Sequence, residues 1–359
     1  MRQFKFSLAV LITMILVGCG GGGGDAPAKP KFTSQVSFGD SLSDVGSYKV
    51  GTVAALGGGQ FTINGTSPTN WTELTASKFG LVAPCAALTG LDGSAAQGFS
   101  VMPPTTHAGC TGYAEGGARV TNPVGVGNKL TGGAAATLGM LTTPVVTQIQ
   151  NFLTSSGGSF NSDEIVFVMA GANDVFVQAA SIGGGLPAAS GVTAVQTAAS
   201  ELATAVKTQI IAKGAKYVAV INVPDIASTP YVTSIADPTI RAQTGGLLDT
   251  LVKAFNAQLK TDLPDSAYVL NVDAYAASKD EVANPGKYNL TNATGTACNL
   301  TQPSPNPLAS SLVCKVANLN TGVTATDHYL FADTVHPTPY GHLLFATYVL
   351  QAMTNKGWY

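Results

Sequence analysis

Charge is scarce in this chain: of its 359 residues 11% are charged, and the formal net charge is −2. Proteins that bind nucleic acids usually present a basic surface. No run of lysine or arginine occurs here, so we expect no nucleic-acid partner. The motifs His-Glu-x-x-His and Gly-x-Ser-x-Gly and the glycine-rich Walker loop are also missing. Their absence argues against a zinc peptidase, an ordinary α/β-hydrolase and a phosphate-loop NTPase.

The apolar run at the start of the chain is too short to span a bilayer. Phe6–Val17 has twelve residues, whereas a membrane-spanning helix needs about 20. The run follows the basic start Met1–Lys5 and ends in Leu16–Cys19, which resembles the lipobox of bacterial lipoproteins. The resemblance implies that residues 1–18 are a signal peptide and that Cys19 becomes the lipidated N-terminus. The alternative is an ordinary secretory signal with a chance cysteine.

A change of composition follows the apolar run. Residues 19–31 are rich in glycine and proline and hold no core residue, which predicts a tether. Gly20 is not the aspartate that retains lipoproteins in the inner membrane of enteric bacteria. We therefore expect export and a lipid anchor in the bacterial cell envelope, in the outer membrane, on its periplasmic or surface face. Residues 32–359 fit one α/β domain with loop insertions near 51–112 and 280–327.

Cysteine is rare, and its use fits export. Besides Cys19 the chain has Cys85, Cys110, Cys298 and Cys314, an even number. No Cys-x-x-Cys occurs, so a redox or zinc role is not expected. Three pairings are possible. We favour the local one, Cys85 with Cys110 and Cys298 with Cys314, because each pair brackets one polar segment rich in glycine, proline and threonine.

Apolar runs alternate with helical patterns along residues 32–359. The continuous apolar run 165–170 is typical of a strand buried on both faces, and therefore of a parallel sheet. We expect the other strands at 35–38, 217–223 and 267–272. We expect helices at 71–79, 144–153, 192–213, 239–261 and 340–353, with irregular chain over most of 51–112. This alternation predicts an α/β fold with a mainly parallel central sheet.

A serine lies at an expected turn from the first strand into a helix. This stretch, Phe38–Gly46, contains Ser41 between Asp40 and Asp44. The N–H groups at a helix start favour negative charge, so Ser41 is a candidate nucleophile that generates an oxyanion. The alternative is a helix N-cap. We interpret Asp40 and Asp44 as structural residues that cap the turn or bond the backbone.

Three later stretches can complete such a site. Asp333 lies three residues before His336, where a carboxylate can orient the imidazole ring. Asn173 follows the buried strand, at the end of a parallel sheet where ligands bind. Gly117 belongs to a glycine pair that can present a backbone N–H to a ligand. Taken singly, each has an ordinary alternative: a surface or capping pair for the first, and a turn for the other two.

Together, and in this order, the four stretches resemble the sequence blocks of the SGNH/GDSL hydrolases. Residues 222–230 also resemble a segment of the branch that includes bacterial lipid acyltransferases and esterases. The resemblance implies a three-layer α/β/α, flavodoxin-like fold. It implies a catalytic triad of Ser41, Asp333 and His336, and an oxyanion hole formed by Ser41, Gly117 and Asn173. It implies no metal and no cofactor. One departure is visible: the second block often begins with Asn, and here that place is Gly112, which leaves the hydrogen bonding near Gly117 open.

The resemblance implies an exported serine esterase or lipase that forms an acyl-enzyme with lipid or other acyl esters. An acyltransferase or a carbohydrate O-acetylesterase would use the same triad. A non-catalytic surface-binding lipoprotein would keep the scaffold without turnover. Trp71, Phe99, Tyr113 and Phe176 are candidates to line an acyl pocket, with the hydrophobic core as the alternative for each. The oligomeric state is not predicted.

Overall fold

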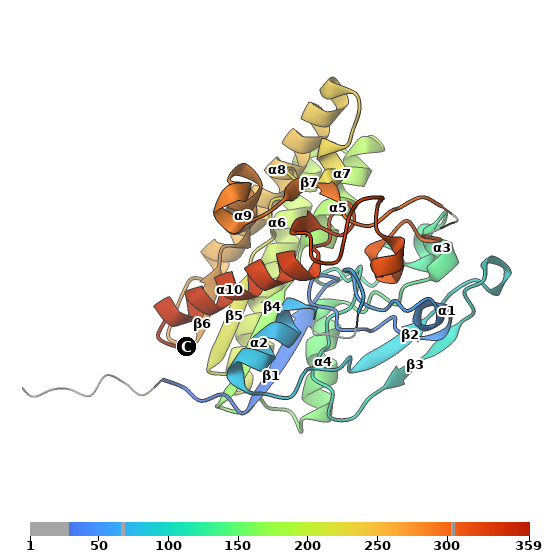
Figure 1. The fold of residues 1–359 in the computed structure, drawn as a ribbon. Helices are drawn as coiled ribbons and strands as arrows, with labels where there is room; N and C mark the ends of the chain where they lie inside the picture. The colour runs from blue at the N-terminus through green and yellow to red at the C-terminus, as the bar shows by residue number, and fades with distance from the viewer. Residues whose placement is uncertain (1–28, 66–68, 303, 305) are drawn as a thin grey trace, which may run out of the picture.

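The computed structural model describes residues 29–359 except 66–68, 303 and 305. The expected signal peptide, Cys19 and most of the expected tether lie outside the described residues. Figure 1 shows the described part as a sheet between layers of helices. Within it, no helix is long and apolar enough to cross a membrane.

The central sheet is parallel and has the strand order β1-β4-β5-β6. Its strands are β1 (Ser34–Gly39), β4 (Glu164–Met169), β5 (Tyr217–Ile221) and β6 (Val269–Val272). These are the four strands that the apolar runs predict. The predicted α/β fold with a mainly parallel sheet is therefore confirmed.

A further extended segment lies along the free edge of β1. Tyr113 donates its N–H to the carbonyl oxygen of Ser37 at 2.8 Å, and Ser37 donates to Thr111 at 3.1 Å. Counted as the second strand, this segment gives the order 2-1-3-4-5, which is that of flavodoxin-like folds. The order reverses at β1, so the ligand crevice of such a sheet lies just beyond the carboxyl end of β1, where Ser41 follows.

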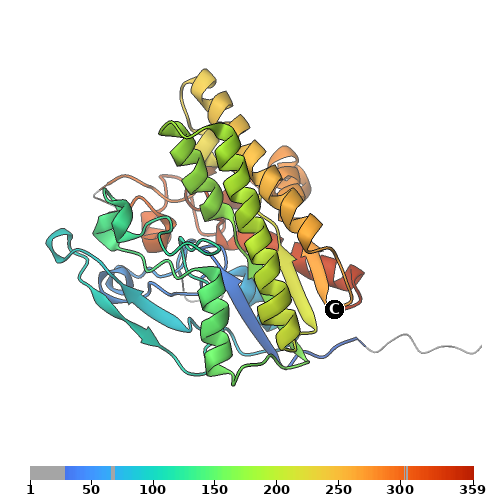
Figure 2. The same ribbon diagram turned by 180° about the vertical axis from the view of Figure 1, so that it is seen from behind.

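Both faces of the sheet are covered, which explains the continuous apolar runs. In β4, Val166 and Val168 belong to one hydrophobic core, whereas Ile165 and Phe167 belong to the other. The first core is covered by α4 (Val145–Ser155), α5 (Ala172–Gly183), α6 (Ala188–Ala205) and α8 (Pro238–Asp262). The second is covered by α2 (Trp71–Phe79) and α10 (Pro339–Asn355). Figure 2 shows the first layer from behind, with α4 in green.

Every helix expected from the apolar patterns of residues 71–353 is present, and the structure contains further helices that those patterns do not predict. Helix α6 continues through a π-helical turn, Val206–Ile210, and a 3-10 turn, Ile211–Lys213, so that the expected helix 192–213 is present as a composite. Helix α5 is not among the expected helices, because its first residues, Ala172 to Asp174, have the composition of a turn. The remaining helices are short: α1 (Gly51–Ala55), α3 (Ala135–Leu138), α7 (Pro230–Thr233) and α9 (Ala274–Ala283).

The two insertions are more ordered than the sequence indicates. Residues 51–112 contain an antiparallel pair, β2 (Leu88–Leu91) and β3 (Met102–Thr106), where we expect irregular chain. Strand β7 (Asn292–Thr296) in the second insertion pairs in parallel with β8 (Tyr329–Phe331). Disulfides join Cys85 to Cys110 and Cys298 to Cys314. This is the local pairing favoured from the sequence.

Candidate active site

The residue that ends β1 brings the chain very close to β4. Gly39 has φ +152°, and a Cβ added there would lie 2.1 Å from the carbonyl oxygen of Met169. Only glycine allows this approach. The chain then turns, with the Ser43 N–H bonded to the carbonyl oxygen of Asp40 at 3.1 Å. Ser41 therefore lies in a tight turn beyond the carboxyl end of the sheet.

The expected helix after Ser41 is not formed, which corrects the sequence interpretation. The first helix after it, α1, begins only at Gly51. The reason is the buried carboxylate of Asp44, which accepts the N–H groups of Gly46 at 2.8 Å and Ser47 at 2.7 Å. These local side-chain bonds replace those of a helix.

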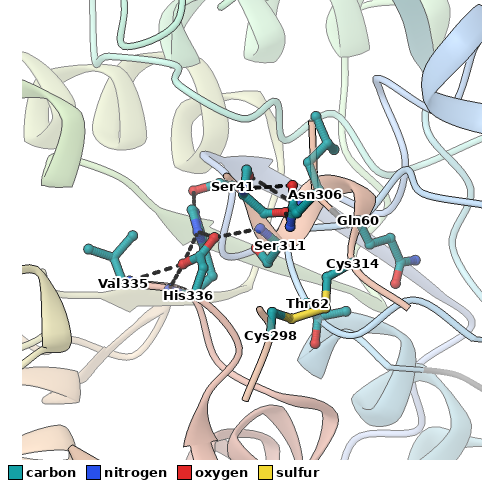
Figure 3. Close-up of polar contacts among 12 residues, drawn as sticks. Ser41, Gln60, Thr62, Cys298, Asn306, Ser311, Cys314, Val335 and His336 are labelled. Carbon is teal, nitrogen blue, oxygen red and sulfur yellow. Dashed lines mark hydrogen bonds and ion pairs between the residues drawn. A yellow bond between two sulfur atoms is a disulfide. The ribbon is translucent and has the colours of Figure 1, made fainter. Parts of the chain in front are cut away.

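Ser41, His336 and Asp333 form one hydrogen-bonded chain. Figure 3 labels Ser41 and His336 and shows the contact between them. The Oγ of Ser41 lies 2.8 Å from Nε2 of His336, and Nδ1 of His336 lies 2.9 Å from both carboxylate oxygens of Asp333. The ring of Phe61 packs on the His336 ring, with centroids 4.9 Å apart. The structure thus joins three residues that are up to 295 positions apart in the chain.

The carboxylate of Asp333 is buried and heavily hydrogen-bonded. Besides the imidazole, it accepts the backbone N–H groups of Ser311 at 2.8 Å, Val335 at 3.0 Å and His336 at 2.8 Å. Burial by itself raises the pKa of Asp333, but the neighbouring His336 and these hydrogen bonds outweigh burial and lower the pKa below its usual value. The side chain is therefore an anion that can orient and stabilise an imidazolium.

Three residues that line one cavity each have a hydrogen-bond donor that is not used within the described structure. The amide of Asn173 donates one hydrogen to the carbonyl oxygen of Ala118 at 2.9 Å, which orients the amide and leaves its second hydrogen available. Among the described residues, the backbone N–H groups of Ser41 and Gly117 have no acceptor. Ser41, Gly117 and Asn173 all line this cavity. Such an arrangement suits the oxyanion of an acyl-transfer reaction.

Asp40 bonds the backbone, in line with its interpretation as a structural residue, and so does Asp174. Asp40 accepts the N–H of Leu42 at 3.1 Å, and burial raises the pKa of Asp40 to about 7. Asp174 pairs with Arg119 at 2.9 Å and accepts the N–H of Val120 at 3.0 Å. Burial also raises the pKa of Asp174.

The cavity beside Ser41 has a volume of about 650 Å³, within the usual range of small-molecule sites. Most of its wall is apolar. Of the four aromatic residues proposed to line an acyl pocket, Phe176 lines this cavity. Trp71 and Phe99 are buried in hydrophobic cores, and Tyr113 packs against the core at Phe38. These three side chains do not line the cavity, and they pack in or against a hydrophobic core, which was the alternative prediction for them.

Several contacts of the site come from residues that the sequence analysis does not single out. Phe61 and Ser311 contact the triad from the two insertions, and neither carries a motif. The other histidines do not belong to the hydrogen-bonded chain of Ser41, His336 and Asp333. His342 is buried in α10, His107 pairs with Thr89, and the His328 ring stacks on the Tyr340 ring.

Comparison with known proteins gives one family model and several similar solved structures. The family model described as GDSL-like lipase/acylhydrolase matches residues 36–349. A member of the lipolytic G-D-S-L family from Veillonella parvula is similar at 15% identity and a TM-score of 0.40, covering 89% of this chain and 98% of its own. The lipase Lip_vut3 from a goat rumen metagenome is similar at 13% identity and a TM-score of 0.37, covering 89% of this chain and 96% of its own. Comparison with curated proteins finds no match.

Proposed function

Because the chain belongs to the family of GDSL-like lipases and acylhydrolases, and is therefore a hydrolase of the esterase or lipase type, we propose that it cleaves carboxylic esters through an acyl-enzyme on Ser41. The observation that carries this proposal is the 2.8 Å contact between Ser41 Oγ and His336 Nε2, with Asp333 on the other ring nitrogen. A hydroxyl held against an oriented imidazole is the arrangement that activates a serine nucleophile.

The proposed mechanism gives each of these residues a role. Ser41 Oγ attacks the ester carbonyl carbon, and its proton passes to Nε2 of His336. The negative carbonyl oxygen is held by the N–H groups of Ser41 and Gly117 and by the amide of Asn173. The intermediate collapses, and the alcohol leaves with the proton from His336. Water then repeats these steps on the acyl-enzyme and releases the acid.

We further propose that the acyl part of the substrate is apolar. The cavity of about 650 Å³ opens beside Ser41 and is lined by Leu138, Phe176 and Leu312 among other apolar side chains. An alkyl chain buried there gains roughly 0.8 kcal/mol per CH₂. A series of p-nitrophenyl esters tests this: kcat/KM should rise from acetate to medium chains. A preference for acetate would support the O-acetylesterase alternative, and transfer to an added alcohol would support the acyltransferase alternative.

The test of the nucleophile is Ser41→Ala with Ser43→Ala as its matched control. The hydroxyl of Ser43 is buried and has no hydrogen-bond partner among the described residues, so removing it should leave activity intact. Ser41→Ala should abolish hydrolysis of p-nitrophenyl butyrate and labelling by a fluorophosphonate, with an unchanged melting temperature. Full activity in Ser41→Ala would refute the proposal. A wild-type protein that neither hydrolyses the ester nor is labelled by the fluorophosphonate would favour the non-catalytic surface-binding alternative.

Export and lipidation at Cys19 stay proposals. They are supported by the lipobox-like Leu16–Cys19 and by cysteines that all pair within residues 32–359. We propose a tether that anchors the enzyme in the bacterial outer membrane. Mass spectrometry of the mature N-terminus should find a lipid-modified Cys19 in the outer-membrane fraction. An unmodified N-terminus downstream of Cys19 would contradict the anchor.

A further inference from the structure

The Gly117 N–H needs a fixed direction if it is to stabilise an oxyanion, and the chain around it offers little rigidity of its own. Gly116 and Gly117 are adjacent glycines, and Gly117 has φ +78°. Added Cβ atoms would lie 2.3 Å from the Phe61 ring at Gly116 and 2.0 Å from the Val126 carbonyl oxygen at Gly117. Neither position therefore accepts a side chain that would restrict the backbone.

The residue that often supplies hydrogen bonds in this region is also missing. The block that carries Gly117 has Gly112 at its start. A Cβ there would lie 2.5 Å from the Val45 side chain and 3.0 Å from the carbonyl oxygen of Cys85. No side chain fits at this position, so the support for the Gly117 peptide must come from elsewhere in the fold.

Two side chains from the segment after Ser41 supply this support. The Tyr48 hydroxyl donates to the carbonyl oxygen of Gly116 at 2.7 Å. The Asp44 carboxylate accepts the Gly116 N–H at 2.8 Å. The Gly116 carbonyl and the Gly117 N–H belong to one planar peptide group, in which the two bonds point in opposite directions. A hydrogen bond that holds the carbonyl therefore also sets the direction of the Gly117 N–H.

The Tyr48 hydroxyl is itself held in place. The side chain is fully buried, and its oxygen accepts the N–H of Thr142 at 3.3 Å. Burial first, and then the charges of Glu115 and Asp44, raise the pKa of Tyr48 well above its usual value. The hydroxyl thus keeps its proton and stays a donor. A hydrogen bond accepted by the carbonyl also polarises the peptide and strengthens its N–H as a donor.

We propose that Tyr48 is the positioning residue of the oxyanion hole: it orients and polarises the peptide whose Gly117 N–H stabilises the transition state, and Asp44 anchors the preceding N–H of that segment. The inference rests on the proposed function. Tyr48 does not touch the substrate. It acts through the Gly116–Gly117 peptide, so its effect belongs to the transition state rather than to substrate binding.

The experiment is Tyr48→Phe, which removes the hydroxyl and keeps the ring. The ring should stay because it packs edge-on against Phe61, with centroids 6.2 Å apart. We expect kcat for p-nitrophenyl butyrate to fall roughly 10- to 100-fold with KM unchanged. This is less than the loss of about 10²- to 10³-fold for removal of a whole donor. Unchanged kcat in folded Tyr48→Phe would overturn the proposal.

A transition-state analogue separates positioning from a general structural role. Phenylboronic acid accepts the Ser41 Oγ at boron, the serine proton passes to His336, and the resulting tetrahedral anion places an oxygen in the oxyanion hole. Its inhibition constant should rise in Tyr48→Phe by a factor similar to the fall in kcat/KM. If kcat falls and boronate affinity does not change, Tyr48 supports the fold and not the oxyanion hole.

The matched control is Tyr340→Phe. The Tyr340 hydroxyl also donates to a backbone carbonyl, that of Tyr288, at 2.9 Å, and its removal should change neither kcat nor boronate affinity. If Tyr48→Phe does not accumulate as folded protein, Asp44→Asn tests the hydrogen bond to the Gly116 N–H instead. We again expect kcat to fall with KM unchanged. An unchanged kcat in this variant would refute the proposal. A wild-type protein that is not labelled by fluorophosphonate would instead remove the proposed function itself.

Discussion

At Asp333, one buried carboxylate is bonded by an imidazole and three backbone N–H groups. These contacts outweigh the cost of burial, because hydrogen bonds to an anion are stronger than neutral ones. The lowered pKa of Asp333 means that its charge persists across the pH range in which a histidine titrates. A persistent charge on Asp333 can therefore hold Nδ1 of His336 in one orientation.

We predict that Asp333→Asn lowers kcat by roughly 10³- to 10⁴-fold, because an amide favours the wrong imidazole tautomer and cannot stabilise the imidazolium. KM should change little. The kinetics of p-nitrophenyl butyrate hydrolysis measure both. Asp327→Asn is the control, since this half-buried aspartate also precedes a histidine but, within the described part of the chain, accepts only a local N–H, that of Thr324. A loss of less than tenfold in Asp333→Asn would contradict the assigned role.

At the scale of elements, the segment 308–314, which precedes β8 in the chain, forms one wall of the site. Leu308, Ser310 and Leu312 line the cavity, and the Ser311 N–H bonds Asp333. The Cys298–Cys314 disulfide holds this segment, as Figure 3 shows beside Ser311. The Asn64 amide adds hydrogen bonds to the carbonyl oxygens of Ser311 at 3.1 Å and Cys314 at 3.0 Å.

The two disulfides should therefore affect activity differently. Replacing Cys298 and Cys314 by serine should reduce stability by about 3 kcal/mol and also lower kcat per folded molecule, because the Ser311 contact to Asp333 loosens. Replacing Cys85 and Cys110 should cost a similar stability with a smaller loss of activity, since that loop does not contact Asp333. Denaturant unfolding and active-site titration measure the two quantities. Equal activity losses in both variants would contradict this.

At the scale of the whole molecule, several carboxyl groups are buried away from the triad. Burial first, and then the charge of Asp280, raise the pKa of Glu281 to about 7 from 4.5. Glu281 is 8% exposed and lines a small second cavity of about 80 Å³ together with His342 and Trp71. The folded protein thus binds a proton there that the unfolded chain releases above its own pKa.

We predict that the contribution of Glu281 to the free energy of unfolding falls as pH rises. Its favourable contribution is fully present below about pH 4.5 and is lost as pH approaches 7, by about 2 to 3 kcal/mol in total. Thermal unfolding at pH 4.5 and pH 8 should therefore show that Glu281→Gln gains stability over wild type at the higher pH. The exposed Glu201→Gln is the matched surface control. A difference between wild type and Glu281→Gln that does not vary with pH would contradict this prediction.

The strands of the central sheet, most of the long helices and the family could be predicted because their signals are local. A strand buried on both faces needs a continuous apolar run, as at 165–170. The blocks around Ser41, Gly117, Asn173 and Asp333 are short, so their order is readable along the chain.

Contacts between distant segments could not be predicted, because no local pattern records them. The helix expected after Ser41 is absent since Asp44 takes the backbone N–H groups that would have begun it. The hydrogen bond from Tyr48 to Gly116, 68 positions away, and the Ser311 contact to Asp333 arise only when the chain is folded. The sequence alone thus determined the central sheet, the family and the candidate catalytic residues. The tertiary structure decided how those side chains are oriented, because orientation depends on hydrogen bonds between segments that meet only in the folded state.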